Sequence, residues 1–342
     1  MIFNQSALGT VELRRTSVDA NLKGFRRKSS PVQAIPNLNS TKGVARPKVA
    51  CRVSGTEQLA IETLQSGQYA FRNDGTSYSE AYRVRSYEVD ARRNATLSTF
   101  ARLLQETATN HALRLGFASE DGFCVDENMA ANNLIWVLSK LRLQIDMAPM
   151  WGECVEVNTW FCESGRLAAR RDWTVSKPEA DVKVAGASSV WVLVNAETRR
   201  LSRMPESMRE QYRPSCPPTP KWAIGEGEGC IKIPDIFEEA EDFSVVEGIR
   251  VRFGDVDMNQ HINNVVYIEW AMESIPQDLW REGKLLEVDL EWCAEGDCEQ
   301  PVDSKICVDT EASDESQVVY IHRVQHSGGG KVLFRARSTW QR

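Results

Sequence analysis

The chain has 342 residues, of which 42% are hydrophobic and 26% are charged, and its net charge is −7. This composition is typical of a globular protein with one large or two ordinary domains. No run of about 18 apolar residues occurs, so we expect no membrane-spanning helix. Nine cysteines are scattered without a CxxC pair. This argues against a zinc site and a disulfide framework, and we expect no metal or redox cofactor.

The first 53 residues differ from the rest of the chain. They contain ten Lys and Arg, only two acids and eight Ser and Thr, which is the composition of an organellar transit peptide. The alternative is a basic tail that binds nucleic acid. Without this segment the 41 basic and 48 acidic residues fall to 31 and 46. The remaining chain then carries about −15, which makes it a poor nucleic-acid binder.

A first folded unit is predicted over residues 78–204, after a polar lead-in at 54–77. A β-rich run at 79–89 predicts a strand, and apolar residues at helical spacing from Leu97 to Leu115 predict a helix. Four strand-like runs follow, at 134–145, 154–160, 167–175 and 184–194. One strand, one long helix and four strands is the pattern of a hot-dog fold, an antiparallel sheet wrapped around a helix.

The pattern repeats over residues 246–342. Alternating apolar residues at 249–253 predict a strand, and a helix is expected at about 265–274, before Pro276. Four more strands are expected at 287–292, 305–310, 318–324 and 332–340. Residues 205–245, rich in Pro, Gly and Glu, are expected to connect the units. We therefore predict an α+β protein with a tandem (double) hot-dog fold, whose two sheets bury their strand edges against each other.

The segment 255–265 is the densest in hydrogen-bonding side chains. Asp257, Asn259 and His261 alternate at i, i+2 and i+4, which in an extended chain places all three on one face. Asn263 or the asparagine after it can cap the following helix. The pattern favours an acid, an amide and an imidazole beside a helix N-terminus, where unpaired N–H groups favour developing negative charge. The alternative is a polar loop that only caps a helix.

The string DxDMNQHxNNVxYIxW at 255–270 resembles the signature of the plant and algal acyl-acyl-carrier-protein (acyl-ACP) thioesterases. Five further segments agree with that family in order: 103–107, 133–137, 170–173, 188–192 and 198–201. The resemblance covers roughly residues 78–342, and the oleoyl-type branch is favoured. It implies hydrolysis of long-chain acyl-ACP to free fatty acid in the plastid stroma, by a monomer or homodimer. It also implies that the acyl pocket lies in the first unit.

The resemblance also assigns the active site. Asp257, Asn259 and His261 match the family's active-site positions, and aligning 290–292 places Glu295 at its essential glutamate. It implies that Glu295 is a general base for water or a nucleophile that forms an anhydride. Asn259 and His261 would hold and polarise the thioester carbonyl, and Asp257 would orient its neighbours. From the residues alone, Glu295 would be read as an ordinary turn carboxylate.

The sequence departs from the family at two positions. Gly296 stands where a cysteine is typical, and a Cys–His site would need Cys298 to shift into place, so we favour carboxylate chemistry. Glu269 stands where glycine is usual, and it would narrow the thioester tunnel or face water. A second candidate catalytic histidine, His111, lies on the apolar stripe of the first helix and is expected to be a core residue.

Acyl carrier proteins are acidic, so docking requires a local basic patch. The densest clusters after the first 53 residues are Arg170 with Arg171, and Arg199 with Arg200 and Arg203. The alternative is that these arginines pair with nearby acids. Two other function classes remain open: a non-catalytic binding protein for acyl chains or acyl carriers, and a hot-dog 3-hydroxyacyl dehydratase.

Overall fold

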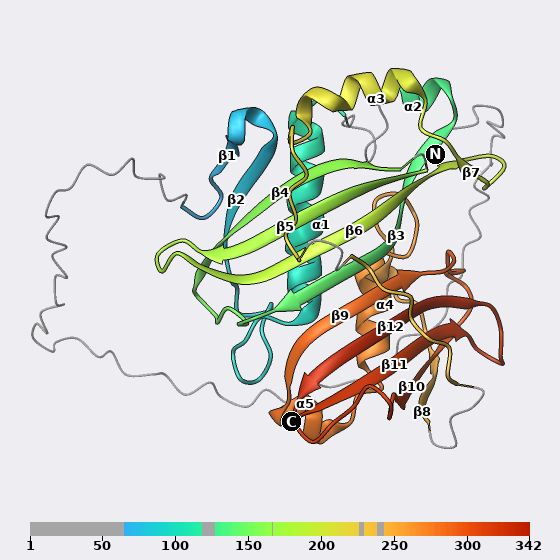
Figure 1. The fold of residues 1–342 in the computed structure, drawn as a ribbon. Helices are drawn as coiled ribbons and strands as arrows, with labels where there is room; N and C mark the ends of the chain where they lie inside the picture. The colour runs from blue at the N-terminus through green and yellow to red at the C-terminus, as the bar shows by residue number, and fades with distance from the viewer. Residues whose placement is uncertain (1–64, 118–126, 166, 226–228, 238–242) are drawn as a thin grey trace, which may run out of the picture. The chain divides into compact units, whose positions relative to one another are not determined.

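The computed structural model describes residues 65–117, 127–165, 167–225, 229–237 and 243–342. The predicted transit peptide at 1–53 and the start of the polar lead-in lie outside the described residues. Over the described residues, the predicted α+β tandem hot-dog architecture is confirmed (Figure 1).

The first half contains one long helix and the five strands predicted for it. Helix α1 begins after Thr96, whose Oγ1 accepts a hydrogen bond from Thr99 N at 3.2 Å. This is an N-cap, which satisfies one of the free N–H groups at the start of a helix. The short strands β1 and β7 and helix α2 were not predicted. The elements are β1 (Tyr69–Arg72), β2 (Ser77–Arg83), α1 (Leu97–Arg114), α2 (Glu127–Ala131), β3 (Leu134–Ile145), β4 (Cys154–Ser164), β5 (Ala168–Lys177), β6 (Val182–Asn195) and β7 (Leu201–Ser202).

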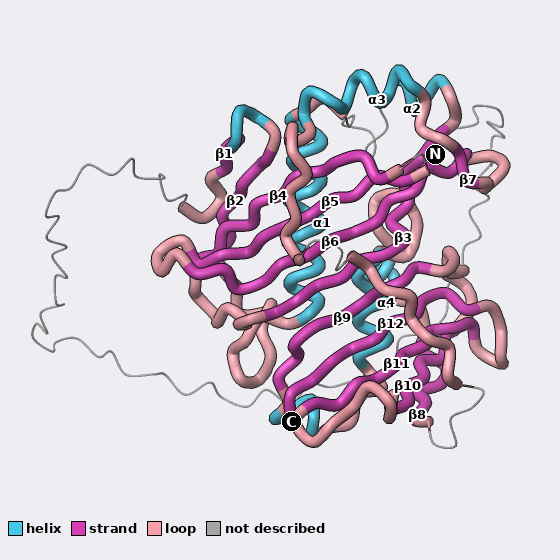
Figure 2. The backbone as a smooth tube through the Cα atoms, viewed as in Figure 1, coloured by secondary structure: helices cyan, strands magenta, loops and turns pink. Residues whose placement is uncertain are grey.

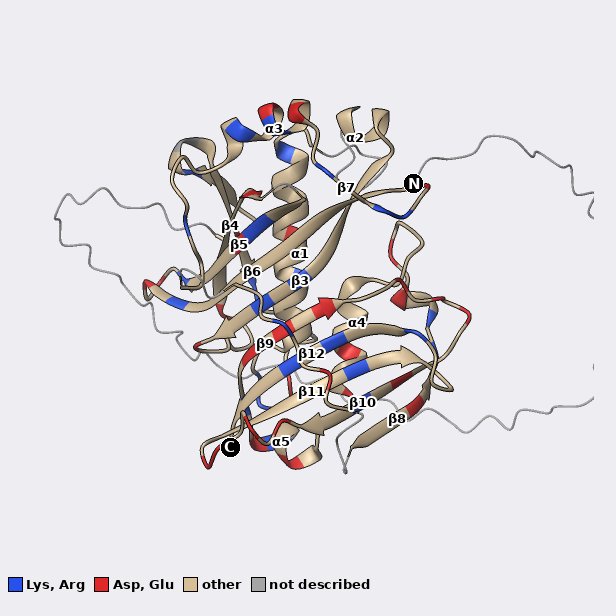
Figure 3. Ribbon diagram, turned by 45° about the vertical axis from the view of Figure 1, so that its right-hand side comes forward, with Lys and Arg blue, Asp and Glu red and all other residues tan. Residues whose placement is uncertain are grey.

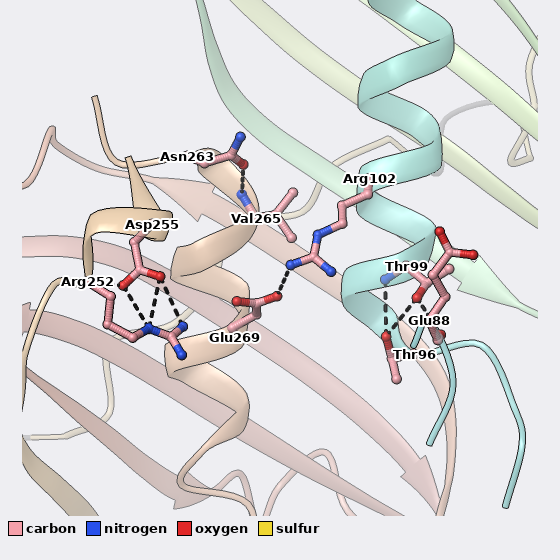
Figure 4. Close-up of polar contacts among 9 residues, drawn as sticks. All are labelled: Glu88, Thr96, Thr99, Arg102, Arg252, Asp255, Asn263, Val265 and Glu269. Carbon is pink, nitrogen blue, oxygen red and sulfur yellow. Dashed lines mark hydrogen bonds and ion pairs between the residues drawn. The ribbon is translucent and has the colours of Figure 1, made fainter. Parts of the chain in front are cut away.

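The second half repeats this order with a shorter central helix and a displaced first strand. The strand predicted at 249–253 is wrong: β8 ends at Ile249, and a 3-10 turn occupies Phe253–Asp255. The Asp255 carboxylate accepts hydrogen bonds from Arg252 N at 2.8 Å and Arg252 Nε at 3.1 Å, which closes this turn (Figure 4). The elements are α3 (Glu206–Tyr212) in the connecting segment, then β8 (Ser244–Ile249), α4 (Asn264–Met272), α5 (Gln277–Glu282), β9 (Lys284–Trp292), β10 (Val302–Val308), β11 (Gln317–His326) and β12 (Val332–Gln341).

Both halves share one antiparallel sheet in the order β1-β2-β4-β5-β6-β3-β9-β12-β11-β10-β8 (Figure 2). The halves join where β3 pairs with β9, with Leu143 opposite Val288. The predicted burial of strand edges against each other is thus confirmed. The Glu287 carboxylate on β9 forms ion pairs with Arg142 of β3 at 2.9 Å and with Arg337 of β12 at 3.3 Å. Figure 3 shows acidic positions on β9 and basic positions on β3 and β12, the two strands that flank it.

One hydrophobic cluster runs through both halves beneath this sheet. It contains Phe100 and Leu104 of α1 and Val266 and Ile268 of α4, all buried, together with inward-facing residues of the strands. Burying a side chain of this size contributes about 1.5–3 kcal/mol. Trp173 on β5 is also buried, and its indole N–H donates to the carbonyl of Leu104 at 3.0 Å. The core therefore fixes α1 and α4 relative to the strands that carry the polar loops.

The connecting segment covers part of the opposite face of the sheet. Ile233 and Phe237 pack against Cys307 and Ile321, which point away from the helices. The backbone N–H of Ala223 donates to the Asp172 carboxylate at 3.2 Å. The segment rich in Pro, Gly and Glu is therefore packed against the sheet where the structure describes it.

His322 on β11 predicts how the stability of the folded protein depends on pH. Its side chain is fully buried, with Nδ1 3.1 Å from the carbonyl of Ala271 and Nε2 2.7 Å from Ser338 Oγ. Burial lowers the pKa of His322 from 6.5 to about 4. Between these two values the unfolded chain binds a proton that the folded protein does not, so stability is expected to fall as the pH falls from 6.5 to 4. The total loss is about 3 kcal/mol.

The measurement is the free energy of unfolding by urea at several pH values, for the wild type and for His322→Gln. The variant is less stable at pH 8 because it disturbs the bonds to Ala271 and Ser338. Its stability should nevertheless decline less steeply between pH 6.5 and pH 4. Equal slopes in the two proteins would contradict the assignment of this titration to His322.

Candidate active site

The segment between β8 and α4 folds back on itself instead of running extended. Asp257 N donates to the carbonyl of His261 at 2.8 Å, and Gln260 N donates to the carbonyl of Asp257 at 2.9 Å. Val256 and Ile262 form an antiparallel bridge across the turn, and Gln260 has a φ of 62°. The expectation of an extended chain with three side chains on one face is therefore wrong, because local hydrogen bonds close a turn here.

The Asp257 carboxylate stabilises this turn from inside. Its Oδ1 accepts hydrogen bonds from the backbone N–H of Asn259 at 2.8 Å and of His261 at 3.3 Å. Aspartate commonly bonds its own backbone two residues ahead in this way. Asp257 therefore orients its neighbours, as expected, by hydrogen bonding to the backbone of Asn259 and His261.

Helix α4 begins directly after the turn. Asn263 is its N-cap, and its Oδ1 accepts from Val265 N at 2.9 Å (Figure 4). The backbone N–H of Asn263 donates to the carbonyl of Asp255 at 2.9 Å, which holds the helix start against the preceding 3-10 turn. The predicted cap is confirmed, and the polar turn lies at the positive end of the helix, as expected.

Glu295 lies in the loop that follows β9 and meets the turn there. Its Oε1 is 2.5 Å from Nδ1 of His261, and its Oε2 contacts the guanidinium of Arg199. The backbone beside it is held by a hydrogen bond from Gly296 N to Tyr267 Oη at 3.0 Å. The side chains of His261 and Glu295 are 33% and 40% exposed, so a substrate can reach both. Residues 34 positions apart in the chain thus form an imidazole–carboxylate pair.

The glycine at position 296, where the family pattern has a cysteine, has a physical explanation. A Cβ at Gly296 would lie 2.9 Å from Ile262 Cδ1 and 3.1 Å from Tyr267 Oη, so a side chain there would push on the residue after His261. Cys298 is exposed, and the His261 ring contacts Glu295. This arrangement supports carboxylate chemistry over a Cys–His pair.

Glu269 forms an ion pair with Arg102 of α1 at 2.6 Å, as Figure 4 shows. The pair links the central helices of the two halves. The glutamate that replaces the usual glycine therefore has a partner on the other helix.

His111 is a core residue, as predicted. It is fully buried, its ring stacks on Tyr78 at 5.5 Å, and its Nδ1 accepts from Arg171 Nη1 at 3.0 Å. Burial, assisted by the positive charge of Arg171, lowers the pKa of His111 to about 2. The imidazole is therefore neutral at physiological pH and lies apart from the turn at 255–263.

The five arginines considered for carrier docking fall into two groups. Arg170 is buried and paired with Asp172 at 2.6 Å, and Arg171 contacts His111 inside the first half. The Arg170 guanidinium is therefore not displayed at the surface as docking requires, whereas the Arg171 side chain is only partly buried and stays a predicted docking residue. The other three, Arg199, Arg200 and Arg203, are exposed around the β6–β7 loop.

The contact of Arg199 with the Glu295 carboxylate was not predicted from the sequence. In the sequence, Arg199 stood out only because it lies in the segment 198–201, which resembles the family. That resemblance does not show which residue the Arg199 side chain contacts.

Within the described ranges, no three His, Cys, Asp or Glu side chains gather as a metal site would require. In the same part of the chain, the helices are too short or too polar to span a bilayer.

Comparison with known proteins assigns the chain. Residues 75–212 match the model of the acyl-ACP thioesterase N-terminal domain, and residues 238–342 match that of the C-terminal domain. The chain belongs to the acyl-ACP thioesterase family.

Relatives and solved structures of thioesterases agree with this assignment. The chain is 35% identical to oleoyl-acyl carrier protein thioesterase 2, chloroplastic, of Arabidopsis thaliana, over 93% of this chain and 89% of that protein. It is 34% identical to palmitoyl-acyl carrier protein thioesterase, chloroplastic, of Cuphea hookeriana, over 78% of this chain and 63% of that protein. The 12:0-ACP thioesterase from Umbellularia californica superposes with a TM-score of 0.71 and 29% identity, over 79% of this chain and 95% of that one.

Proposed function

We propose that this protein hydrolyses the thioester of a long-chain fatty acyl-ACP and releases the free fatty acid, which ends chain elongation. The observation that carries the proposal is the contact of Glu295 with His261, within a turn stabilised by Asp257 at the start of α4. Membership of the acyl-ACP thioesterase family supports it.

The proposed chemistry assigns one task to each group. Glu295 takes a proton from water, and the resulting hydroxide adds to the thioester carbonyl carbon. Asn259 and His261 donate hydrogen bonds to the carbonyl oxygen as it becomes negative, beside the positive end of α4. The C–S bond then breaks, and the proton held by Glu295 passes to the leaving thiolate. In the alternative route Glu295 attacks the carbonyl itself, and water cleaves the anhydride that forms.

We propose that the protein acts in the plastid stroma after removal of residues 1–53. The basic, acid-poor composition of that segment supports this, as do relatives that are named chloroplastic. We also propose that residues 78–204 hold the acyl chain, that 205–245 connect the halves, and that 246–342 supply the catalytic groups.

The other two function classes are not favoured. A non-catalytic acyl-binding protein has no need of a carboxylate and an imidazole in contact at an accessible surface, as Glu295 and His261 are. A dehydratase could use such a pair, but the relatives are named as thioesterases and acyl-ACP hydrolases.

A panel of carrier-bound substrates tests the proposed function and the chain-length preference. We expect the highest kcat/KM on oleoyl-ACP, followed by palmitoyl-ACP, with free fatty acid as the product. Relatives of both specificities are similarly identical to this chain, so the preference for oleoyl rests on the sequence resemblance alone. A maximum on octanoyl- or lauroyl-ACP would overturn the preference. Release of acid from none of them, with turnover of a 3-hydroxyacyl substrate, would overturn the function.

We further propose that the exposed Arg200 and Arg203 attract the acidic carrier protein. The double variant Arg200→Glu/Arg203→Glu is expected to raise KM for oleoyl-ACP at low salt. It should leave the hydrolysis of a small oleoyl thioester unchanged. The difference from wild type should shrink as salt is added, because charges more than about 8 Å apart are screened at physiological ionic strength. Steady-state kinetics at two salt concentrations provide the measurement.

The control is Arg281→Glu, which reverses an exposed arginine on α5. An equal rise in KM in this control would indicate a general effect of net charge, and the docking site would then lie elsewhere.

A further inference from the structure

The loop between β6 and β7 holds Arg199 in an uncommon backbone conformation. Its φ is 57°, in the left-handed region that residues other than glycine rarely adopt. Asn195 closes the loop: its Oδ1 accepts from Thr198 N at 2.8 Å, and its carbonyl accepts from Arg199 N at 2.9 Å. Strained conformations of this kind persist where the surroundings over-determine them, and they concentrate at functional sites.

The Arg199 side chain reaches from the first half of the chain to the catalytic carboxylate of the second. Its guanidinium contacts Oε2 of Glu295, and the other carboxylate oxygen lies 2.5 Å from Nδ1 of His261. Both oxygens of Glu295 are thus held by different partners. These two contacts fix the rotation of the carboxylate plane. With the plane fixed in this way, Oε1 faces the His261 imidazole.

Stability of the fold is a poor explanation for this contact. The Arg199 and Glu295 side chains are 53% and 40% exposed. Ion pairs this exposed contribute little to folding, because water screens the charges and two long side chains lose freedom. The β3–β9 pairing and the shared core already join the halves. The effect of the contact is therefore local to Glu295.

We propose that Arg199 is a positioning residue for the reaction: it orients the Glu295 carboxylate towards His261, so that the first half of the chain completes the active site of the second. This inference rests on the proposed thioester hydrolysis. It separates Arg199 from Arg200 and Arg203, whose proposed contacts are with the carrier protein.

The experiment compares Arg199→Ala, Arg199→Lys and a loop control, Thr198→Ala, on oleoyl-ACP and on a small oleoyl thioester. We expect Arg199→Ala to lower kcat about 10- to 100-fold on both substrates, because small displacements of a reacting group are costly. KM should stay within about threefold of the wild-type value in both cases. The kcat of Arg199→Lys should lie between those of the wild type and Arg199→Ala, since a lysine can contact one carboxylate oxygen but lacks the planar guanidinium. Thr198→Ala should retain wild-type kinetics.

A second measurement separates positioning from a structural role. Methylguanidinium added to Arg199→Ala should restore part of the lost kcat, and it should not affect the wild type. A low kcat without such rescue, in a variant that melts well below the wild type, would make the residue structural. A rise in KM for oleoyl-ACP alone would assign Arg199 to docking. An unchanged or increased kcat in Arg199→Ala would also overturn the proposal. A wild type inactive on every acyl-ACP would instead overturn the proposed function.

Discussion

Glu295→Gln is expected to lower kcat on oleoyl-ACP by about 10²–10⁴, and by more if Glu295 is the nucleophile. Glutamine has nearly the same size and shape, so the loop after β9 and the bond from Gly296 N to Tyr267 Oη should persist. What is lost is a carboxylate that can take a proton from water or attack the carbonyl. KM should change little, because no part of the acyl chain is expected to bind this carboxylate.

The measurement is kcat by release of free oleate, with the melting temperature as a check on folding. The control is Glu299→Gln, an exposed glutamate in the same loop, which should retain wild-type kcat. Near-normal turnover in Glu295→Gln would eliminate Glu295 as the reacting group.

A single turnover in ¹⁸O-water, with enzyme in excess, then tests for the anhydride route. Label in the Glu295 carboxylate would require an anhydride that water cleaves at the glutamyl carbonyl, whereas label in the fatty acid alone is the product of direct attack by water and also of cleavage of an anhydride at its fatty acyl carbonyl.

His261→Ala is expected to lower kcat by about 10²–10³, and the double variant with Glu295→Gln should lose little more than the worse single variant. The reason is that the two side chains contact each other at 2.5 Å and act on one carbonyl group. Removing either partner leaves the other without its function, so the two losses should not add.

The measurement is a double-mutant cycle on kcat. The melting temperatures of the wild type, the two single variants and the double variant are compared as a check on folding. Because the His261 side chain is 33% exposed, its removal should cost little stability, and a loss of activity then reports on chemistry. Fully additive losses would contradict a joint role. The residues would then act in separate steps.

Local patterns in the sequence predicted most of the secondary structure. The helix expected from Leu97 to Leu115 is α1, which runs from Leu97 to Arg114, and the strand expected at 134–145 is β3. Both follow from periodic burial within one continuous segment, which the spacing of apolar residues reports directly. The strand predicted at 249–253 failed because alternation there was overridden by the bonds of Arg252 to Asp255, which favour a turn.

The sequence by itself determined the tandem arrangement of elements, a helix cap at Asn263 or Asn264, and the polar segment that holds Asp257, Asn259 and His261. Resemblance to the family added Glu295. These depend on residue order within short stretches, where a side chain meets its own neighbours along the chain.

Only the tertiary structure decided which distant groups meet. The contact of His261 with Glu295 and that of Arg199 with the same carboxylate depend on how β3 and β9 pair and on how the loops after β6 and β9 pack. Arg199 and Glu295 are 96 residues apart, and no periodicity along the chain records such a contact. It arises because the shared sheet and core fix the backbone of both loops, which leaves the two side chains within reach of each other.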